Sequence, residues 1–256
     1  MLKALIFDVD GTLVDTEELH RRAFNQAFLE YELDWNWGLN LYAELLGVSG
    51  GADRIARYID RVDLPAAEKI RLRHLVPGIH RAKTRIYGEL LAGGKAQLRP
   101  GVARLAGEAR RAGLKIGLAA TSASANVQPL VAAAFGAEAR DAIGAIVCAD
   151  QVARKKPAPD LYELLLATLR VPAAACVAFE DSANGLAAAK AAGLYTVVTP
   201  SRWTIGQDFT GADLLIPNLG DPEAPLGPEV VRVLGAPWLD LARIEQRLGA
   251  VRPVRA

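Results

Sequence analysis

The sequence has little cysteine, almost no excess of charge and no long run of apolar residues. Its two cysteines, Cys148 and Cys176, both lie in apolar stretches, which indicates buried thiols in a reducing compartment and argues against a disulfide framework. The formal net charge of the 256 residues is +1, which argues against general binding to nucleic acid or membrane surfaces. No apolar run reaches the roughly 18 residues of a membrane-spanning helix. We therefore expect a cytoplasmic protein with neither nucleic acid nor a membrane as its partner.

The predicted secondary-structure pattern of the chain changes twice. An apolar strand at residues 2–7 is followed by helical spacing with no strand pattern, and helix and strand then alternate, which predicts an α/β fold with a Rossmann-like parallel sheet. We assign residues 1–15 and 94–218 to the core. Residues 16–93 form an inserted helical cap, the kind of insertion that covers the mouth of an active site. Residues 219–256 are a C-terminal extension of unknown role.

Two carboxylates follow the first strand. Asp8 and Asp10 are two residues apart, so on an extended backbone both can face the crevice where parallel sheets bind ligands. Gly11 lets the chain turn sharply after them. Such carboxylates repel each other unless a cation or a shared proton lies between them. The pattern favours metal-assisted transfer of an anionic group over its alternative, a simple Asx-type turn.

These residues resemble the DxDG[TV] signature of the haloacid dehalogenase superfamily of phosphotransferases. Three later segments at predicted strand ends resemble its other motifs, in the same order. They are the hydroxyl-bearing loop 119–122, the Lys-Pro box 155–160 and the acidic segment 179–185, which continues into a Gly- and Ala-rich stretch. The resemblance implies the superfamily's core fold with its inserted cap.

The resemblance also implies catalytic roles. Asp8 would attack phosphorus and form an aspartyl-phosphate, and Asp10 would protonate the leaving oxygen and then deprotonate water. Lys156, directly before the first proline of its box, would neutralise phosphoryl and nucleophile charge. Mg²⁺ would be held by Asp8, the Asp10 backbone carbonyl and Asp181, with Glu180 supporting the metal's waters or Lys156.

Some positions depart from the motifs of the superfamily. Ala120 stands where the superfamily usually has a hydroxyl, so Thr121 is the nearest candidate to bind a phosphoryl oxygen, with Ser122 as the alternative. A polar loop at a helix start is the competing interpretation. Lys155 is expected to be solvated. A dehalogenase needs no metal and lacks the second acid, so Asp181 and Asp10 argue against that activity.

The cap segments 16–25, 50–57 and 80–84 resemble the CbbY-type subgroup, relatives of β-phosphoglucomutase with a helical cap. Phosphatases of this subgroup remove the 1-phosphate of xylulose 1,5-bisphosphate. The predicted substrate-binding residues are Glu17, His20, Gly50, Gly51, Arg54, His80, Arg81, Lys83, Ser122 and Asn126.

Arg54 is expected to bind a second phosphate bidentately, with His80, Arg81 and Lys83 adding positive charge. For each cation a solvated helix face is the alternative. Ala52 departs from the subgroup, which commonly has Lys there.

The leading hypothesis is a monomeric, Mg²⁺-dependent sugar-bisphosphate phosphatase that converts xylulose 1,5-bisphosphate to xylulose 5-phosphate. The alternative is a β-phosphoglucomutase-like phosphomutase, which would want Lys or Arg in loops 46–49 and 124–126. Leu46 and Ala125 supply neither. A non-enzymatic binding role is disfavoured because every catalytic residue type is present.

Overall fold

The computed structural model describes residues 1–94, 97–140 and 143–251. Within these residues six strands form one sheet in the order β3-β2-β1-β4-β5-β6, and every neighbouring pair is parallel. The strands are β1 (Ala4–Phe7), β2 (Lys115–Ala120), β3 (Ile143–Cys148), β4 (Cys176–Glu180), β5 (Tyr195–Val198) and β6 (Leu214–Leu215). The predicted α/β fold with a Rossmann-like parallel sheet is confirmed.

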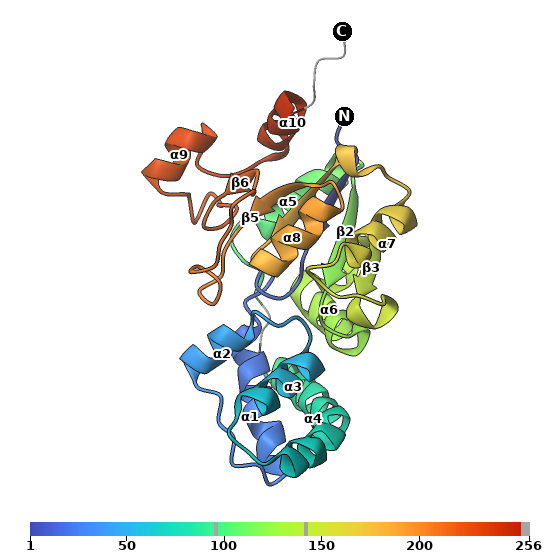
Figure 1. Ribbon diagram of the computed structural model, residues 1–256. Coiled ribbons are helices and arrows are strands. Elements are labelled where there is room, and N and C mark those ends of the chain that lie inside the picture. The colour runs from blue at the N-terminus through green and yellow to red at the C-terminus, as the bar shows by residue number, and fades with distance from the viewer. Residues whose placement is uncertain (95–96, 141–142, 252–256) are drawn as a thin grey trace.

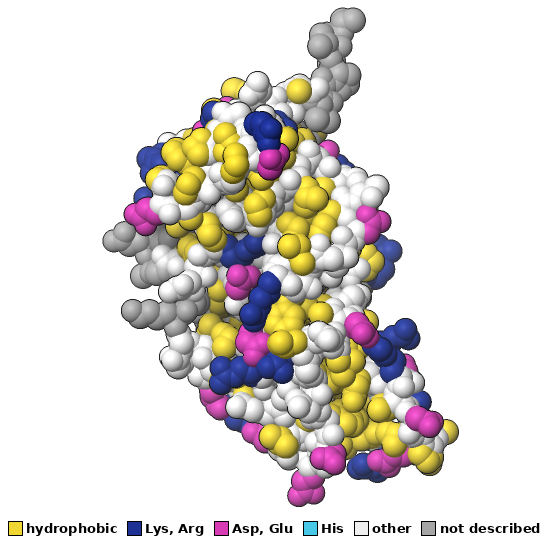
Figure 2. All heavy atoms as spheres, turned by 90° about the vertical axis from the view of Figure 1, so that its left-hand side faces the viewer, with side chains coloured by type: hydrophobic (Ala, Val, Ile, Leu, Met, Phe, Trp, Pro, Cys, Tyr) yellow, Lys and Arg dark blue, Asp and Glu magenta, His cyan; other side chains and the backbone are white. Residues whose placement is uncertain are grey.

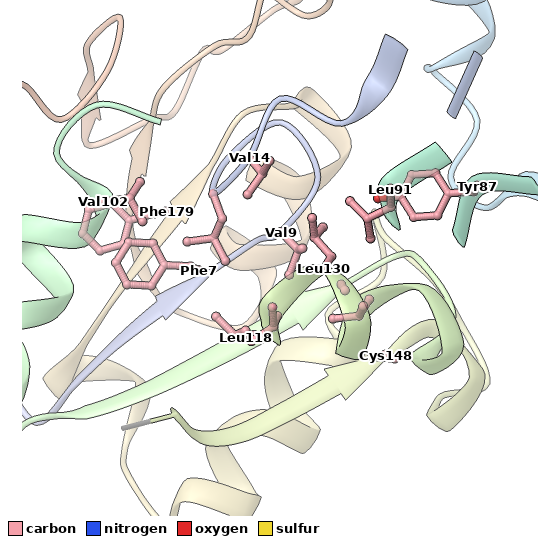
Figure 3. Packing of buried hydrophobic residues seen from close by; sticks show 14 of the residues in the cluster. Phe7, Val9, Val14, Tyr87, Leu91, Val102, Leu118, Leu130, Cys148 and Phe179 are labelled. Atoms are coloured by element: carbon pink, nitrogen blue, oxygen red, sulfur yellow. The ribbon is translucent and has the colours of Figure 1, made fainter. Parts of the chain in front are cut away.

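Strand β1 lies inside the sheet, and all four of its side chains are buried. Because side chains alternate along a strand, Leu5 and Phe7 pack into one hydrophobic cluster and Ala4 and Ile6 into another. Phe7 stacks on Phe179 of the neighbouring strand with ring centroids 4.5 Å apart (Figure 3). An apolar run without alternation thus marks a strand that is buried on both faces.

Helices cover both faces of the sheet. Residues of α5 and α6 join the cluster of Phe7, whereas residues of α7 and α8 join the cluster of Ile6. The bounds are α5 (Val102–Arg111), α6 (Ser124–Arg140), α7 (Asp160–Leu169) and α8 (Ala183–Ala191), with short 3₁₀ turns at Ala149–Gln151 and Ala173–Ala175. The connections between strands therefore follow the usual pattern of a parallel sheet.

A block of helices lies between β1 and α5 in sequence and apart from the sheet in space, at the bottom of the view (Figure 1). It consists of α1 (Glu17–Glu30), α2 (Leu39–Leu45), α3 (Gly51–Arg61) and α4 (Ala66–Ala92). Helices α1 and α3 both pack along α4. At the waist between this block and the sheet, basic and acidic side chains alternate on the surface (Figure 2). The division of the chain into core, cap and extension stays a prediction.

The sequence pattern suggests two helices on either side of Pro77, but α4 is continuous through it. Pro77 is exposed, so the backbone carbonyl that loses its hydrogen bond can reach water, while Val76 and Ile79 are buried and hold both halves in place.

The C-terminal residues add α9 (Pro228–Leu234) and α10 (Leu241–Val251). Leu239, Ile244 and Leu248 belong to the same hydrophobic cluster as Phe7, and Arg104 of α5 donates to the Leu239 carbonyl at 2.9 Å. The extension thus packs on the sheet side of the molecule. Cys148 and Cys176 are buried and form no disulfide. No helix of the described residues combines the length and apolarity needed to cross a membrane.

Candidate active site

Strand register brings three carboxylates together. Phe7 pairs with Phe179, and the Asp8 amide donates to the Phe179 carbonyl at 2.9 Å, so Asp8 lies beside the end of β4 where Glu180 and Asp181 follow. The turn after Asp8 passes close to Asp181. Gly11 has φ +89°, and a Cβ there would lie 2.2 Å from Asp181 Oδ2, so glycine makes this approach possible.

Lys156 enters this cluster from the loop before α7. Its Nζ donates to Asp8 Oδ1 at 2.7 Å, to Glu180 Oε1 at 2.6 Å and to the Ala119 carbonyl at 3.0 Å. These contacts use all three ammonium hydrogens. Burial by itself would lower the pKa of Lys156, but the charges of Asp8 and Glu180 raise it above its ordinary value. Lys156 is therefore a fixed positive charge next to Asp8.

Asp8, Glu180 and Asp181 each place a carboxylate oxygen within 4.8 Å of the others, and all three are buried. Burial raises the pKa of Asp8 to about 7, with Lys156 opposing this shift and Glu180 adding to it. Burial, Asp8 and Glu180 raise the pKa of Asp181 well above its ordinary value. A bound cation would relieve this repulsion.

The three acids differ in how far the protein already engages them. Glu180 accepts from Lys156, from the Tyr162 hydroxyl and from the Asp181 amide. Asp8 Oδ2, by contrast, is buried and has no hydrogen-bond partner within the described part of the chain. The all-oxygen set therefore fits a hard metal ion, with Asp8 and Asp181 better placed as ligands than Glu180.

Asp10 lies beside this cluster and is held by three side chains. Ser122 Oγ donates to its Oδ2 at 2.6 Å, and Thr16 Oγ1 and His20 Nε2 both contact its Oδ1, the latter at 3.0 Å. Burial alone would raise the pKa of Asp10, but His20, Ser122 and Thr16 together hold it below its ordinary value. Asp10 is thus an oriented carboxylate that accepts protons reluctantly.

His20 links Asp10 to helix α4. A carboxylate can only accept, so Nε2 carries a proton, and Nδ1 lies 2.6 Å from Lys83 Nζ, which can only donate. The imidazole stacks on Tyr87 with centroids 4.0 Å apart. Lys83 is buried, and burial lowers its pKa to about 8.

A second network connects the other helices of the block. Arg54 Nη1 donates to the Tyr42 hydroxyl at 3.1 Å, and that hydroxyl donates to Glu17 Oε2 at 2.6 Å. The Arg54 guanidinium also donates to the backbone carbonyls of Leu45 and Val48. The protein itself therefore positions Arg54 firmly.

Most predicted site residues line one pocket of about 230 Å³ between the sheet and the helical block. They are Asp8, Asp10, Glu17, His20, Gly50, Gly51, Arg54, His80, Lys83, Thr121, Ser122, Asn126, Lys156 and Asp181. Thr121 thus lines the pocket, as does its alternative Ser122, whose hydroxyl is directed to Asp10. Glu180 lies fully buried behind them.

The structure does not bring Arg81 to the pocket. Its side chain is exposed, whereas His80 and Lys83 line the pocket. On an α-helix His80 and Lys83 are three residues apart and share a face, while Arg81 is turned about 100° away from His80. Of the three cations, His80 and Lys83 therefore line the pocket and Arg81 does not, and the role of each toward a substrate stays a prediction.

Residues 2–193 match the haloacid dehalogenase-like hydrolase family. The chain belongs to this family. It is 46% identical over 243 residues to the plasmid-encoded protein CbbY of Cupriavidus necator, covering 95% of each chain. The resemblance seen in the motifs is therefore confirmed.

Two solved structures of CbbY from Rhodobacter sphaeroides are similar to the hydrolase, each with a TM-score of 0.78. One is a complex with phosphate, at 46% identity, covering 85% of this chain and 95% of that one. The other is a mutant in complex with xylulose-1,5-bisphosphate, at 45% identity, covering 87% and 98%.

The pocket of the hydrolase also contains residues that the motifs did not single out. Lys155, expected to be solvated, lines it and forms an ion pair with Asp53 of α3. Asn184 lines it and donates to the Gly47 carbonyl at 2.9 Å. Thr204 lines it from the loop after β5. Asn184 lies within the acidic motif and Lys155 within the Lys-Pro box, which is a signal for both, but no pattern in the sequence marks Thr204.

Proposed function

We propose that this hydrolase is a Mg²⁺-dependent phosphatase that removes one phosphate from a sugar bisphosphate. Its preferred reaction would convert xylulose 1,5-bisphosphate to xylulose 5-phosphate. The observation that carries the proposal is one pocket with an Asp8–Lys156–Asp181 cluster on the sheet side and basic side chains of α3 and α4 on the other. The complex of Rhodobacter sphaeroides CbbY with xylulose-1,5-bisphosphate supports this choice of substrate.

In this proposal Asp8 and Asp181 would hold the Mg²⁺ together with the Asp10 backbone carbonyl. Glu180 is engaged by Lys156 and Tyr162, so it supports the site rather than ligating directly. When bound, the metal would neutralise charge on the phosphoryl oxygens. Lys156 supplies the second positive charge, because its ammonium already lies 2.7 Å from Asp8.

The first step is attack of Asp8 on phosphorus. One carboxylate oxygen of Asp8 would form the new bond to phosphorus while the bond from phosphorus to the sugar oxygen breaks, and the other oxygen would stay available to the metal. Lys156, 2.7 Å from Oδ1, holds the carboxylate in place. Asp10 gives its proton to the departing oxygen. The incoming phosphate is negative and raises the pKa of Asp10, which permits this protonation.

The second step returns the enzyme to its starting state. Asp10 takes a proton from water, the water oxygen attacks phosphorus, and the bond from phosphorus to Asp8 breaks to release phosphate. The low pKa of Asp10 then returns this proton to solvent, so each cycle takes up one proton as the substrate binds and releases one after phosphate leaves. The contacts from Thr16, His20 and Ser122 keep Asp10 oriented.

Phosphate release from a panel of sugar mono- and bisphosphates, with Mg²⁺ or with a chelator, tests the proposal. We expect the highest kcat/KM for xylulose 1,5-bisphosphate, no turnover in chelator and none in Asp8→Asn. Conversion of β-glucose 1-phosphate to glucose 6-phosphate with little phosphate release would favour a phosphomutase instead. No metal-dependent turnover of any substrate would contradict the phosphatase assignment altogether.

A further inference from the structure

Lys155 lies where the core meets the helical block, at the pocket. It precedes Lys156 in the chain, yet its Nζ forms an ion pair with Asp53 Oδ2 of α3 and has no second polar partner among the residues that the structure describes. The side chains are 34% and 55% exposed. Solvated ion pairs of this kind contribute little to stability, so an anion can replace Asp53 at small cost.

The other cations of the pocket are committed elsewhere. Lys156 uses its three hydrogens on Asp8, Glu180 and a carbonyl. Arg54 uses three of its five N–H donors on the Tyr42 hydroxyl and two carbonyls, which fix its position. Lys83 is buried against His20. Among the pocket-lining cations of the described residues, Lys155 is therefore the one held only by an exposed carboxylate.

The surroundings of Lys155 favour an anion. Helix α3 begins at Gly51, and no side chain caps its first amides, so its N-terminus carries partial positive charge. A Cβ on Gly50 would lie 2.7 Å from Lys155 Nζ, and one on Gly51 would lie 2.7 Å from His80 Nε2. Burial, Lys83 and Lys155 lower the pKa of His80 to about 4, which leaves it a neutral hydrogen-bonding group at neutral pH.

Two carboxylates oppose an anion at this place. Asp53 is the present partner of Lys155, and Asp150 also lines the pocket, where it accepts from Ser124 Oγ at 2.9 Å. An incoming phosphate would have to displace Asp53 from the ammonium and would then be repelled by it.

We propose that Lys155 is a specificity-determining residue that binds the non-reacting phosphate of a bisphosphate substrate in place of Asp53. The inference rests on the proposed sugar-bisphosphate function and adds a recognition residue from the core. Lys155 and Asp53 then act with opposite sign: the lysine favours bisphosphates and the aspartate disfavours them. If the ion pair served only to hold core and cap together, removing either residue would change KM for the bisphosphate in the same direction.

The test measures kcat and KM of wild type, Lys155→Ala, Lys155→Arg and Asp53→Asn with two substrates, xylulose 1,5-bisphosphate and xylulose 1-phosphate. We expect Lys155→Ala to raise KM for the bisphosphate by about tenfold or more, with a loss under about threefold on the monophosphate. Lys155→Arg should recover most of the bisphosphate affinity, and Asp53→Asn should lower KM for the bisphosphate by about threefold.

Equal losses for Lys155→Ala and Asp53→Asn on both substrates would show a structural contact and overturn the inference. So would a wild-type preference for the bisphosphate that Lys155→Ala retains, and in that case the proposed function stands. If wild type itself does not prefer the bisphosphate, both the proposed substrate class and the role of Lys155 are wrong.

Discussion

The two walls of the pocket are built by different means. On the sheet side, Asp8, Glu180 and Asp181 follow two paired strands, so backbone register sets their positions. On the helical side, Lys83 meets His20 through packing of α4 against α1, and only side-chain contacts fix their geometry. The proposed chemistry thus depends on positions that strand pairing sets, whereas substrate recognition depends on contacts that single substitutions can alter.

Asp10 is where the two walls meet. Ser122 contacts it from the end of β2, and His20 contacts it from α1. The protonation of Asp10 therefore responds to both sides of the pocket, and substitutions on either side test how separate the two walls are.

The largest effect should come from breaking the sheet side. Lys156→Met removes the charge shared by Asp8 and Glu180 and leaves two buried carboxylates without their cation. We expect kcat to fall by about a thousandfold or more. Phosphate release at saturating substrate, with circular dichroism to confirm folding, measures this.

Lys190→Met is the matched control, because Lys190 is an exposed residue of α8 and forms an ion pair with Asp213, and neither of the two lines the pocket. Its activity should stay close to that of wild type. If a folded Lys156→Met protein keeps a tenth of the wild-type activity, catalysis does not depend mainly on the sheet side of the pocket.

The next effect concerns the link between the walls. His20→Ala removes a contact that lowers the pKa of Asp10, so that pKa should rise toward its ordinary value. Because Asp10 must be ionised to activate water in the second step, the acid limb of kcat should move to higher pH, with about a ten- to hundredfold loss at low pH. His74→Ala, at an exposed position of α4, should leave the profile in place. If the acid limb does not move in His20→Ala, the protonation of Asp10 does not depend on the helical side of the pocket.

The sequence predicts the sheet side better than the helical side, for a physical reason. Strand order and the motif spacing are enough to bring Asp8 and Asp181 to one edge, because carboxyl ends of neighbouring parallel strands must meet there. Arg81 lies outside the pocket lining although the sequence groups it with His80 and Lys83, because a cluster of cations does not reveal the helix phase. Lys155 was missed because it is chemically identical to Lys156, and only the path of the loop sends one into the core and the other toward Asp53.

A smaller effect, on stability, tests burial on the helical side. The pKa of Lys83 is lowered from 10.5 to about 8 in the folded protein, so between these values the unfolded chain binds more protons and wild-type stability rises with pH. Lys83→Met has no ammonium at this position, so its stability does not rise with pH in this way. The free energy of unfolding of the variant minus that of wild type should therefore fall by about 2–3 kcal/mol from pH 7 to pH 10.

Urea denaturation at several pH values measures this difference. The comparison variant is Lys69→Met, on the same helix but partly exposed, for which the difference should be nearly constant. A constant difference for Lys83→Met would mean that water reaches the Lys83 ammonium, and His20 would then lack its buried partner.

The smallest effects compare Gly50, which lines the pocket, with Gly88, which does not. Gly50 has φ +95°, and a Cβ there would press on Lys155 and Asp53, whereas a Cβ on Gly88 in α4 meets nothing within 4 Å. Gly50→Ala should destabilise the protein by about 1–2 kcal/mol and raise KM for the bisphosphate. Gly88→Ala should stabilise it by about 0.5–1 kcal/mol, because alanine favours a helix interior, without changing KM. Thermal unfolding and steady-state kinetics of both variants separate the outcomes. If Gly50→Ala loses stability but keeps its KM, the start of α3 supports the fold without shaping the binding of the second phosphate.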